Sequence, residues 1–179
     1  MVRTFVAIDL PEEIRERARE SQEMLRPSGG RLAIVDPANL HITVKFLGEV
    51  DPARIEPIVE ALRAVRASPF EMTVGYAVCN PPRRPRVVWC DVADAGESAA
   101  LARQVDDLLA PLGFPRESRP FRPHVTLARV KESHPSQCSQ VERAPHNALG
   151  RFRVESIKLK KSTLTPGGPI YEDLREVPL

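Results

Sequence analysis

The chain has 179 residues, of which 42% are hydrophobic and 28% charged, so it is long enough for one domain that buries a core without disulfides or a structural metal. Lysine and arginine total 26 against 24 acidic residues, and the net charge of +2 excludes a histone-like coat of nucleic acid while allowing a local basic patch. No apolar run reaches the roughly 18 residues of a membrane span. The short apolar run near the amino terminus meets Asp9. We therefore expect neither a signal peptide nor a membrane partner.

The first half of the chain alternates between strand and helix patterns. Residues 4–10 (TFVAIDL) predict a strand, and Pro11-Glu12-Glu13 predicts a helix start, because proline suits the first turn and acidic residues suit its positive end. The remaining predictions for this half are a break at Ser28-Gly29-Gly30, a strand at 31–35, a strand at 40–47 that turns at Gly48, a helix from Asp51 to about Ala67, and a strand at 70–78.

The second half is dominated by strands. Apolar residues recur at helical spacing from Leu101 to Leu109, with Gly113 as a stop. Strands are predicted at 87–92, 123–130 and 152–160, followed by a last short strand at Ile170, and residues 131–149 are predicted to be irregular. This order favours helices packed on curved antiparallel or mixed sheets over a doubly wound parallel sheet. No linker divides the chain, so residues 1–179 are predicted to form a single α+β domain.

The three cysteines, Cys79, Cys90 and Cys138, lie far apart in the sequence. No pair has Cys-x-x-Cys spacing, which argues against a zinc ribbon or a thioredoxin-type site. We therefore expect free thiols in a reducing compartment, and hence a cytoplasmic protein.

One short pattern occurs twice, as HITV at residues 41–44 and HVTL at residues 124–127. On a strand, residues i and i+2 share a face, so each histidine would lie beside its threonine while the apolar residues point into the core. Two copies would allow a cleft in which two imidazoles face each other.

Structural, metal-binding and nucleophilic roles for this repeat are less favoured. A single histidine on a strand is usually structural, but two of the four histidines here carry threonine two residues later, with apolar residues at matching positions. Neither copy holds a carboxylate or cysteine at ligand spacing, and a catalytic zinc normally takes three protein ligands. No Gly-x-Ser-x-Gly or Cys-His framework supports nucleophilic catalysis. We expect no metal and no cofactor.

Two histidines beside two hydroxyls suit in-line displacement at phosphorus. Near neutral pH one imidazole can be neutral and act as general base while the other is protonated and acts as general acid. Threonine hydroxyls can donate hydrogen bonds to the non-bridging oxygens of the transition state. This set fits the opening of a cyclic phosphodiester by water, although it does not choose which histidine is the acid.

Four segments resemble the two-histidine (2H) phosphoesterases, and among them the LigT-like RNA 2′,3′-cyclic phosphodiesterases, also called 2′-5′ RNA ligases. The segments are RTFVAIDL at residues 3–10, NLHITVKFLG at 39–48, RPHVTLAR at 122–129 and LTPGGPIY at 164–171. Together they span nearly the whole chain and are highly specific, whereas either His-x-Thr alone would be a weak signal.

The resemblance implies a bilobal fold with pseudo-twofold symmetry, in which two curved, mostly antiparallel sheets carry helices on the outside and enclose the active-site cleft. It implies His41 as proton donor, His124 as proton acceptor, and hydrolysis of the cyclic phosphate to a 2′-phosphomonoester. We assign Thr43 and Thr126 to the phosphate oxygens. The implied partner is RNA with a 2′,3′-cyclic phosphate end, including tRNA halves that the family joins reversibly. We expect a monomer, since no heptad or exposed apolar stripe is evident.

The resemblance also implies a phosphate-binding role for Arg129, at position +5 from His124. On a regular strand that residue would face away from the histidine; twist, a bulge or the length of the arginine would bring it back. Phe46 has the same +5 offset from His41 and is a candidate for stacking on a base, although core packing is the favoured interpretation.

Several further residues have open interpretations. Arg83, Arg84 and Arg86 form a basic loop that would either contact an RNA backbone or simply be solvated. Lys158, Lys160 and Lys161 would either touch RNA or keep a strand edge soluble. Trp89 is expected in the core, and Tyr171 is expected to help close the cleft.

Two alternatives to RNA hydrolysis remain open at this stage. One is an RNA-end binding module that recognises cyclic phosphate without processing it, which would show salt-sensitive binding and no product. The other is a phosphodiesterase that acts on small cyclic nucleotides.

Overall fold

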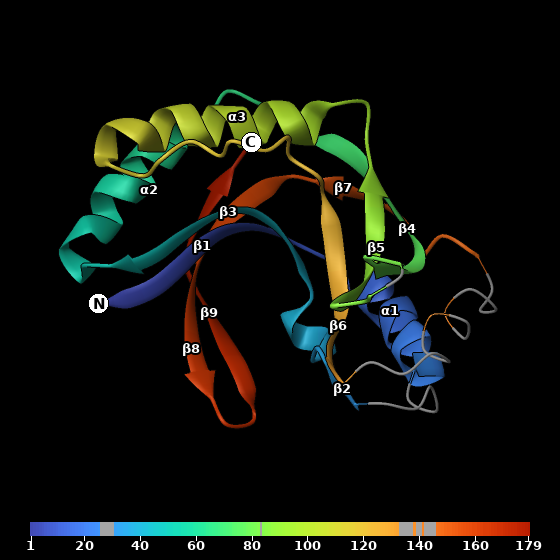
Figure 1. The fold of residues 1–179 in the computed structure, drawn as a ribbon. Coiled ribbons are helices and arrows are strands. Elements are labelled where there is room, and N and C mark those ends of the chain that lie inside the picture. Colours follow the sequence, from blue (N-terminus) through green and yellow to red (C-terminus); the bar gives the residue numbers. More distant parts are fainter. Residues whose placement is uncertain (26–30, 83, 133–137, 139–140, 142–145) are drawn as a thin grey trace.

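The computed structural model describes residues 1–25, 31–82, 84–132, 138, 141 and 146–179. Within these ranges it contains nine strands and three α-helices (Figure 1). The strands are β1 (Val2–Asp9), β2 (Arg31–Ile34), β3 (His41–Val50), β4 (Phe70–Asn80), β5 (Val87–Ala93), β6 (His124–Glu132), β7 (Gly150–Val154), β8 (Ser156–Thr165) and β9 (Gly168–Pro178). The helices are α1 (Glu12–Leu25), α2 (Ile55–Arg63) and α3 (Glu97–Leu109).

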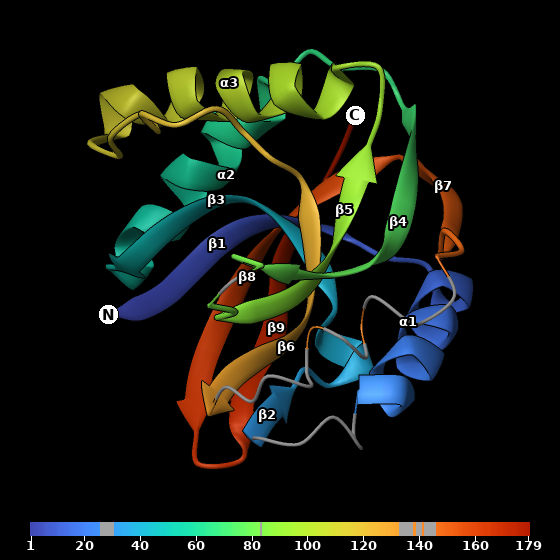
Figure 2. The same ribbon diagram turned by 45° about the vertical axis from the view of Figure 1, so that its right-hand side comes forward.

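The strands form a curled sheet in two halves, and every strand pair described is antiparallel. One half has the order β3-β1-β8-β9, and the other has the order β7-β4-β5-β6, with β2 beside β6. The halves meet where Ile42 of β3 pairs with Val125 of β6. Figures 1 and 2 show the halves curving away from this seam. The predicted α+β, bilobal arrangement of curved antiparallel sheets is confirmed.

The helices cover the outside of the two halves. Helix α1 packs against β6 and β7, whereas α2 and α3 pack against each other and against β9 and β3, respectively. Each helix buries one apolar side, represented by Ile14, Ile58 and Leu101, which are at most 1% exposed. In Figure 2, α2 and α3 lie above one half while α1 lies beside the other. No described helix is long and apolar enough to cross a membrane.

The closing strands differ from the prediction. The expected single strand at 152–160 is divided at Glu155, because β7 pairs with β4 of one half while β8 pairs with β1 and β9 of the other. The last strand is eleven residues long rather than short. Its many charged residues break the apolar alternation by which a strand is predicted. The strand forms nevertheless, because its backbone pairs with β8 along the whole length.

Two other element boundaries also differ. Gly48 was expected to turn the strand, but it lies inside β3, where it adopts a φ of 75° and the strand continues to Val50. The helix expected to begin at Asp51 starts as a 3-10 turn capped by the Asp51 carboxylate, and α2 ends at Arg63. The predicted break at Ser28-Gly29-Gly30 lies outside the described residues.

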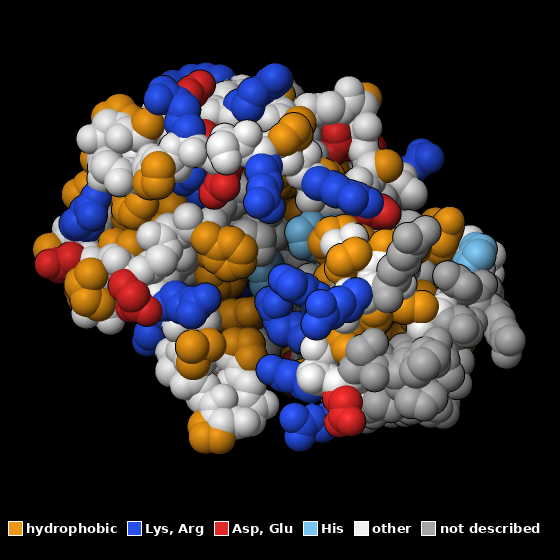
Figure 3. Space-filling view, viewed as in Figure 1, with side chains coloured by type: hydrophobic (Ala, Val, Ile, Leu, Met, Phe, Trp, Pro, Cys, Tyr) orange, Lys and Arg blue, Asp and Glu red, His pale blue; other side chains and the backbone are white. Residues whose placement is uncertain are grey.

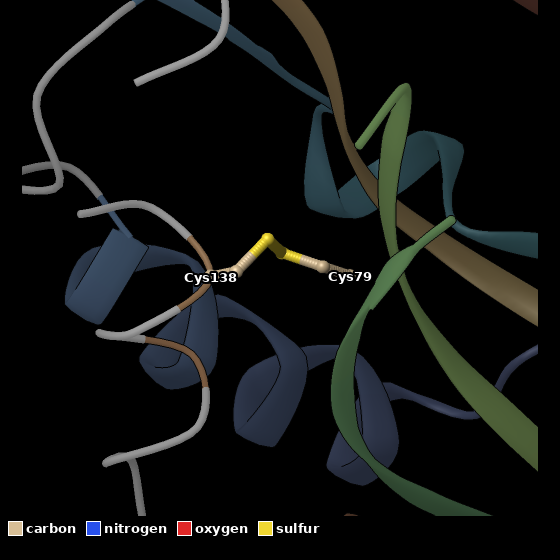
Figure 4. The surroundings of a disulfide bond; sticks show 2 residues. All are labelled: Cys79 and Cys138. Atoms are coloured by element: carbon tan, nitrogen blue, oxygen red, sulfur yellow. A yellow bond between two sulfur atoms is a disulfide. The ribbon is translucent and has the colours of Figure 1, made fainter. Parts of the chain in front are cut away.

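The cysteine prediction is wrong for two of the three residues. Cys79, at the end of β4, and Cys138 form a disulfide with a Cα–Cα distance of 5.8 Å (Figure 4). The two are 59 residues apart in sequence, so only the fold brings them together. Cys90 is a free, buried thiol, and burial raises its pKa to about 12. The inference of a reducing compartment from unpaired cysteines therefore loses its basis.

Candidate active site

The seam between the two halves brings the two His-x-Thr motifs together. Ile42 and Val125, the central residues of the motifs, pair directly across the antiparallel seam, and both side chains are fully buried. Side chains alternate along a strand, so the histidines and threonines on either side of this pair point to the opposite face. Because the pairing is antiparallel, His41 lies across from Thr126, and Thr43 lies across from His124.

A bulge in β3 brings Phe46 to the same face as His41. Thr43 pairs with Ala7 and Lys45 pairs with Val6, so Val44 is an extra residue between two regular pairs. Val44 and Lys45 are both buried, and the alternation of exposed and buried side chains shifts by one position. Phe46 is consequently 60% exposed, so the favoured interpretation of Phe46 as a core residue is wrong.

A bulge at the corresponding place in β6 brings Arg129 to the face of His124. Thr126 pairs with Trp89 and Ala128 with Val88, which leaves Leu127 as the extra residue. Leu127 and Ala128 are both fully buried, and Arg129 is exposed on the cleft side. Of the three routes by which Arg129 could reach this face, the bulge is the one observed. The two motifs thus share a distortion as well as a sequence pattern.

The two imidazoles are oriented in the same way. The Nδ1 of His41 lies 2.7 Å from the carbonyl oxygen of Asn39, and that of His124 lies 2.9 Å from the carbonyl oxygen of Arg122. A carbonyl oxygen can only accept, so each Nδ1 carries a hydrogen and donates it, which leaves Nε2 for the cleft. The Nε2 of His41 is 3.1 Å from the Thr43 hydroxyl. The orienting roles of Asn39 and Arg122 were not predicted from the sequence, although both residues lie two positions before a motif histidine.

Asn39 also ties the site to the hairpin formed by β8 and β9. Its side-chain Nδ2 donates a hydrogen bond of 2.9 Å to the carbonyl oxygen of Pro169. In the same hairpin, Tyr171 places its ring edge-on to that of His41 at 5.2 Å, and Phe5 contacts both rings. The expectation that Tyr171 lies at the cleft agrees with this position.

Aromatic contacts also surround the second histidine. The ring of Trp89 lies 4.3 Å from that of His124, and the guanidinium of Arg122 lies 5.2 Å from the indole. The guanidinium of Arg122 also forms an ion pair with the carboxylate of Asp91. Trp89 is therefore a lining residue of the cleft and not the core residue that was expected, because β5 turns this side chain toward the motif face of β6.

The protonation of His41 depends on its surroundings. Burial lowers its pKa below the ordinary value, the positive charges of Lys160 and His124 lower it further, and the Asn39 carbonyl and Asp9 oppose the change. A neutral His41 therefore predominates at neutral pH when the cleft holds only water. An anion bound against the ring would favour the protonated form.

The site occupies a cleft of about 1980 Å³ that runs between the two halves. Basic side chains from both halves line it, among them Arg3, Arg122, Arg129 and Lys131. In Figure 3, histidine side chains are visible deep in the central hollow, with lysine and arginine side chains along one wall and hydrophobic side chains along the other. This charge distribution suits an anion that also carries an apolar part.

The lysines of β8 do not fill the roles considered for them. Lys158 and Lys160 are both engaged by Asp9 and Asp173, and β8 lies between β1 and β9 rather than at an edge. Lys161 pairs with Glu172. Neither RNA contact nor edge protection therefore explains the first two residues.

The described arginines of the basic loop, Arg84 and Arg86, do not belong to the lining of the site. Both are exposed, and Arg83 lies outside the described residues. Within the described part of the chain, no group of three or more His, Cys, Asp or Glu side chains is arranged to hold a metal ion.

Comparison with known families identifies the kind of protein that carries this site. The family model described as LigT like Phosphoesterase matches residues 8–89 and 92–171, which include both His-x-Thr motifs. The chain belongs to the LigT-like phosphoesterase family. It is therefore an enzyme, a cyclic phosphodiesterase of the two-histidine superfamily, and the predicted family is confirmed.

Full-length relatives and solved structures agree with this LigT-like assignment. A protein of Archaeoglobus fulgidus named RNA 2′,3′-cyclic phosphodiesterase is 40% identical over 175 residues, covering 97% of this chain and 98% of the relative. A protein of the same name from Methanocaldococcus jannaschii is 36% identical over 178 residues, covering 98% and 99%. A crystal structure of a Thermus thermophilus protein superposes with a TM-score of 0.83 at 33% identity, covering 99% and 97%. That of E. coli LigT complexed with 3′-AMP does so with a TM-score of 0.81 at 30% identity, covering 99% and 98%.

Proposed function

We propose that this LigT-like enzyme hydrolyses RNA 2′,3′-cyclic phosphate ends to 2′-phosphomonoesters, with two histidines as acid and base. The pairing of Ile42 with Val125 carries this proposal, because it sets both motif histidines on one face of one cleft. The printed names of the full-length relatives support RNA as the substrate class.

The reaction is an in-line displacement at phosphorus. Nε2 of His124 takes a proton from water as the water oxygen forms a bond to phosphorus. The bond between phosphorus and the ribose 3′ oxygen breaks, and Nε2 of His41 supplies the proton that this oxygen needs to leave. The product carries a 2′-phosphate, His124 ends protonated and His41 neutral, and proton exchange with solvent restores the starting state.

The hydroxyls and cations of the cleft hold the phosphate during this step. Thr43 and Thr126 donate hydrogen bonds to the non-bridging oxygens, where negative charge develops in the transition state. Arg129 lies on the same face and makes no ion pair with any described residue, so its guanidinium is available to the phosphate. Phe46 presents an exposed ring on which the base of the terminal nucleotide stacks.

The substrate itself supplies the charge that His41 needs in order to act as the donor. Burial keeps the pKa of His41 low in the empty cleft. The cyclic phosphodiester is anionic and displaces water from the ring, so it raises the pKa of His41 on binding. Repulsion between the two imidazoles then favours the state in which one alone is protonated, as the mechanism requires.

Joining of 2′-5′ ends, as with tRNA halves, would be the same displacement with a different nucleophile. The 5′ hydroxyl of a second RNA end would replace water, His124 would take its proton, and His41 would again protonate the departing 3′ oxygen, which leaves a 2′-5′ phosphodiester; the histidines would exchange roles only when that bond is cleaved back to the cyclic phosphate. Water needs no binding site, whereas a second RNA end must be held, so hydrolysis is the dominant reaction. Both histidines come from a single chain, and we propose that residues 1–179 act as one monomeric bilobal unit.

Replacing either histidine tests this function directly. His41→Ala and His124→Ala should each reduce turnover of a short RNA with a 2′,3′-cyclic phosphate end by at least about a thousandfold, because each removes a proton transfer and the alignment that it provides. The assay is product analysis that separates 2′- from 3′-phosphate ends, in the presence of EDTA. His146→Ala is the matched control, since His146 stacks on Tyr76 outside the cleft.

The control variant should retain wild-type turnover, and circular dichroism should show that all three variants are folded. A 3′-phosphate product would contradict the assigned leaving oxygen. Loss of activity in EDTA would contradict a metal-free mechanism, and RNA that binds without conversion would favour the binding module.

A further inference from the structure

The cleft is larger than the reacting nucleotide requires. Its volume of about 1980 Å³ exceeds the roughly 300–1,000 Å³ of a pocket for one small ligand. The cleft extends beyond the two histidines, between the β8–β9 hairpin on one side and the second half of β6 on the other. Apart from Arg129, the residues along this extension have no part in the chemistry described above.

The hairpin side of the extension is apolar. Ser162 pairs with Tyr171 and Leu164 pairs with Pro169, so these four side chains share one face of the hairpin. Tyr171 contacts His41 on that face, which is therefore the face toward the cleft. Leu164 is 67% exposed there, and it continues the apolar surface that begins at Phe46 and Tyr171.

The β6 side of the extension is basic. Arg129 follows the bulge at Leu127, and Lys131 is the extra residue of a second irregularity where β6 pairs with β2; both line the cleft. Both are exposed, and neither makes an ion pair with any described residue. Two residues along a strand advance about 6.6 Å, a step comparable to one nucleotide of a single strand.

The two sides face each other across the hollow. The pKa of Tyr171 is raised by burial, and the positive charges of Arg129, Arg3 and Lys160 oppose that rise, so the Arg129 charge lies within electrostatic range of the phenol. Figure 3 shows basic side chains on one wall of the hollow and hydrophobic side chains on the other. Proteins that hold single-stranded nucleic acid combine a basic groove for the backbone with aromatic side chains for the bases, and apolar side chains also pack against unpaired bases.

We propose that this extension is a second nucleotide subsite, which binds the nucleotide that precedes the cyclic-phosphate end of a single-stranded RNA. Leu164 and Pro169 form the platform for its base, and Lys131 binds the phosphate that links it to the terminal nucleotide. The inference rests on the proposed function and adds to it that the enzyme selects an RNA end over a free cyclic nucleotide.

A comparison of two substrates tests the subsite. Adenosine 2′,3′-cyclic phosphate fills the reacting position alone, whereas an adenylyl dinucleotide with the same cyclic end also fills the second. Wild-type kcat/KM should be about tenfold higher or more for the dinucleotide, since it adds one base contact and one phosphate contact. Raising the salt concentration should reduce this preference.

Two variants separate the two contacts. Leu164→Ser should reduce the preference for the dinucleotide by about three- to tenfold, with its salt dependence kept. Lys131→Gln should also reduce the preference, and it should lower the slope of log kcat/KM against log salt by about 0.7 for the dinucleotide, the contribution of one phosphate contact in a single strand.

Matched controls lie away from the cleft. Met24→Ser removes an exposed apolar side chain of α1, and Arg151→Gln removes an exposed charge of β7. Neither residue lines the cleft, and both variants should keep the full preference for the dinucleotide.

The outcomes are distinguishable from failure of the proposed function. Equal kcat/KM for the two substrates, or an unchanged preference in both cleft variants, would overturn the subsite while leaving the hydrolytic function intact. If neither substrate is hydrolysed, the proposed function fails. In that case the affinities of adenosine 2′-phosphate and the corresponding dinucleotide, measured by calorimetry, still decide whether the second subsite exists.

Discussion

His41 and His124 reach the cleft through the same local geometry, but their surroundings differ. Each donates its Nδ1 hydrogen to the carbonyl two residues earlier, so Nε2 is the reacting nitrogen in both. The pKa of His41 is lowered mainly by burial, and the charges of Lys160 and Asp9 act on it in opposite directions. This difference allows the acid and the base to be told apart by experiment.

The pH dependence of activity should report on His41. As proton donor it must be protonated, so kcat/KM falls as pH rises through its pKa in the free enzyme, which lies below the ordinary 6.5. The same limb of the kcat profile should lie at higher pH, because bound phosphate raises that pKa. Lys160→Met removes a positive charge and should move the alkaline limb of kcat/KM upward in pH.

The opposite assignment has its own signature. If His41 were the proton acceptor, its deprotonation would create activity, and Lys160→Met would then move the acidic limb instead of the alkaline one. That outcome would contradict the donor role given to His41. Circular dichroism at each pH excludes unfolding as the cause of either limb.

At the scale of elements, the two bulges matter more than the strands that contain them. Val44 in β3 and Leu127 in β6 each add one residue to a strand, and each moves the side chains that follow, up to the next irregularity at Leu47 or Lys131, to the other face. Phe46 and Arg129 therefore join the histidines instead of the core. Alternation predicted the strands correctly up to the bulges, but a bulge is decided by pairing with β1 or β5 and leaves no clear mark in the local sequence.

A ring of charges links β1, β8 and β9 beside the site. Lys158 lies 3.0 Å from Asp9 and 2.7 Å from Asp173, and Lys160 lies 2.8 Å and 2.5 Å from the same two carboxylates. Lys160 is only 8% exposed. The carboxylates of Asp9 and Asp173 both compensate the charge of its ammonium group, and a buried lysine is tolerated when its charge is paired in this way.

This ring should give the protein a measurable sensitivity to acid. Burial raises the pKa of Asp173, but its hydrogen bonds and charge interactions with Lys158 and Lys160 outweigh burial and lower the pKa overall. The stabilisation is present above the carboxyl's unfolded pKa near 3.9 and is lost as pH falls through the lower folded value. Asp173→Asn should therefore reduce the free energy of unfolding at pH 7 by about 1 kcal/mol, limited by solvent screening.

Urea unfolding at pH 7 and at pH 3 checks this prediction. The difference between wild type and Asp173→Asn should shrink at pH 3, where the wild-type carboxyl is becoming neutral. An equal difference at both values would show that packing and not charge accounts for the loss. Glu172→Gln, which affects the exposed pair with Lys161, serves as the control.

At the scale of the whole molecule, the disulfide joins parts of the chain that are distant in sequence. Alkylation of the unreduced, denatured protein should label Cys90 alone, and reduction should make all three cysteines reactive. Removing the bond by Cys79→Ser should lower the free energy of unfolding by about 2–4 kcal/mol, because the bond closes a long loop in the unfolded chain. Three labelled cysteines before reduction would contradict the pairing.

The division of the molecule into two halves explains what could be predicted and what could not. Local periodicity of apolar residues was enough to predict most strands and helices. Helix α1, for example, begins where Pro11 and the two glutamates predicted a helix start. The prediction of a single strand at 152–160 was wrong because its residues pair with strands of two different halves of the sheet. Trp89 was placed in the core because its neighbour His124 is 35 residues away and joins it only through the pairing of β5 with β6.

The family and its two His-x-Thr motifs were determined by sequence alone, since a repeated local pattern on a strand defines which side chains share a face. Tertiary structure decided the rest: the bulges that turn Phe46 and Arg129 toward the cleft, the carboxylates that hold Lys160, and the partner of Cys79. Each of these depends on which distant segment lies alongside, and on its register. Strand register and long-range contact are properties of the packed chain, and no window of neighbouring residues contains them.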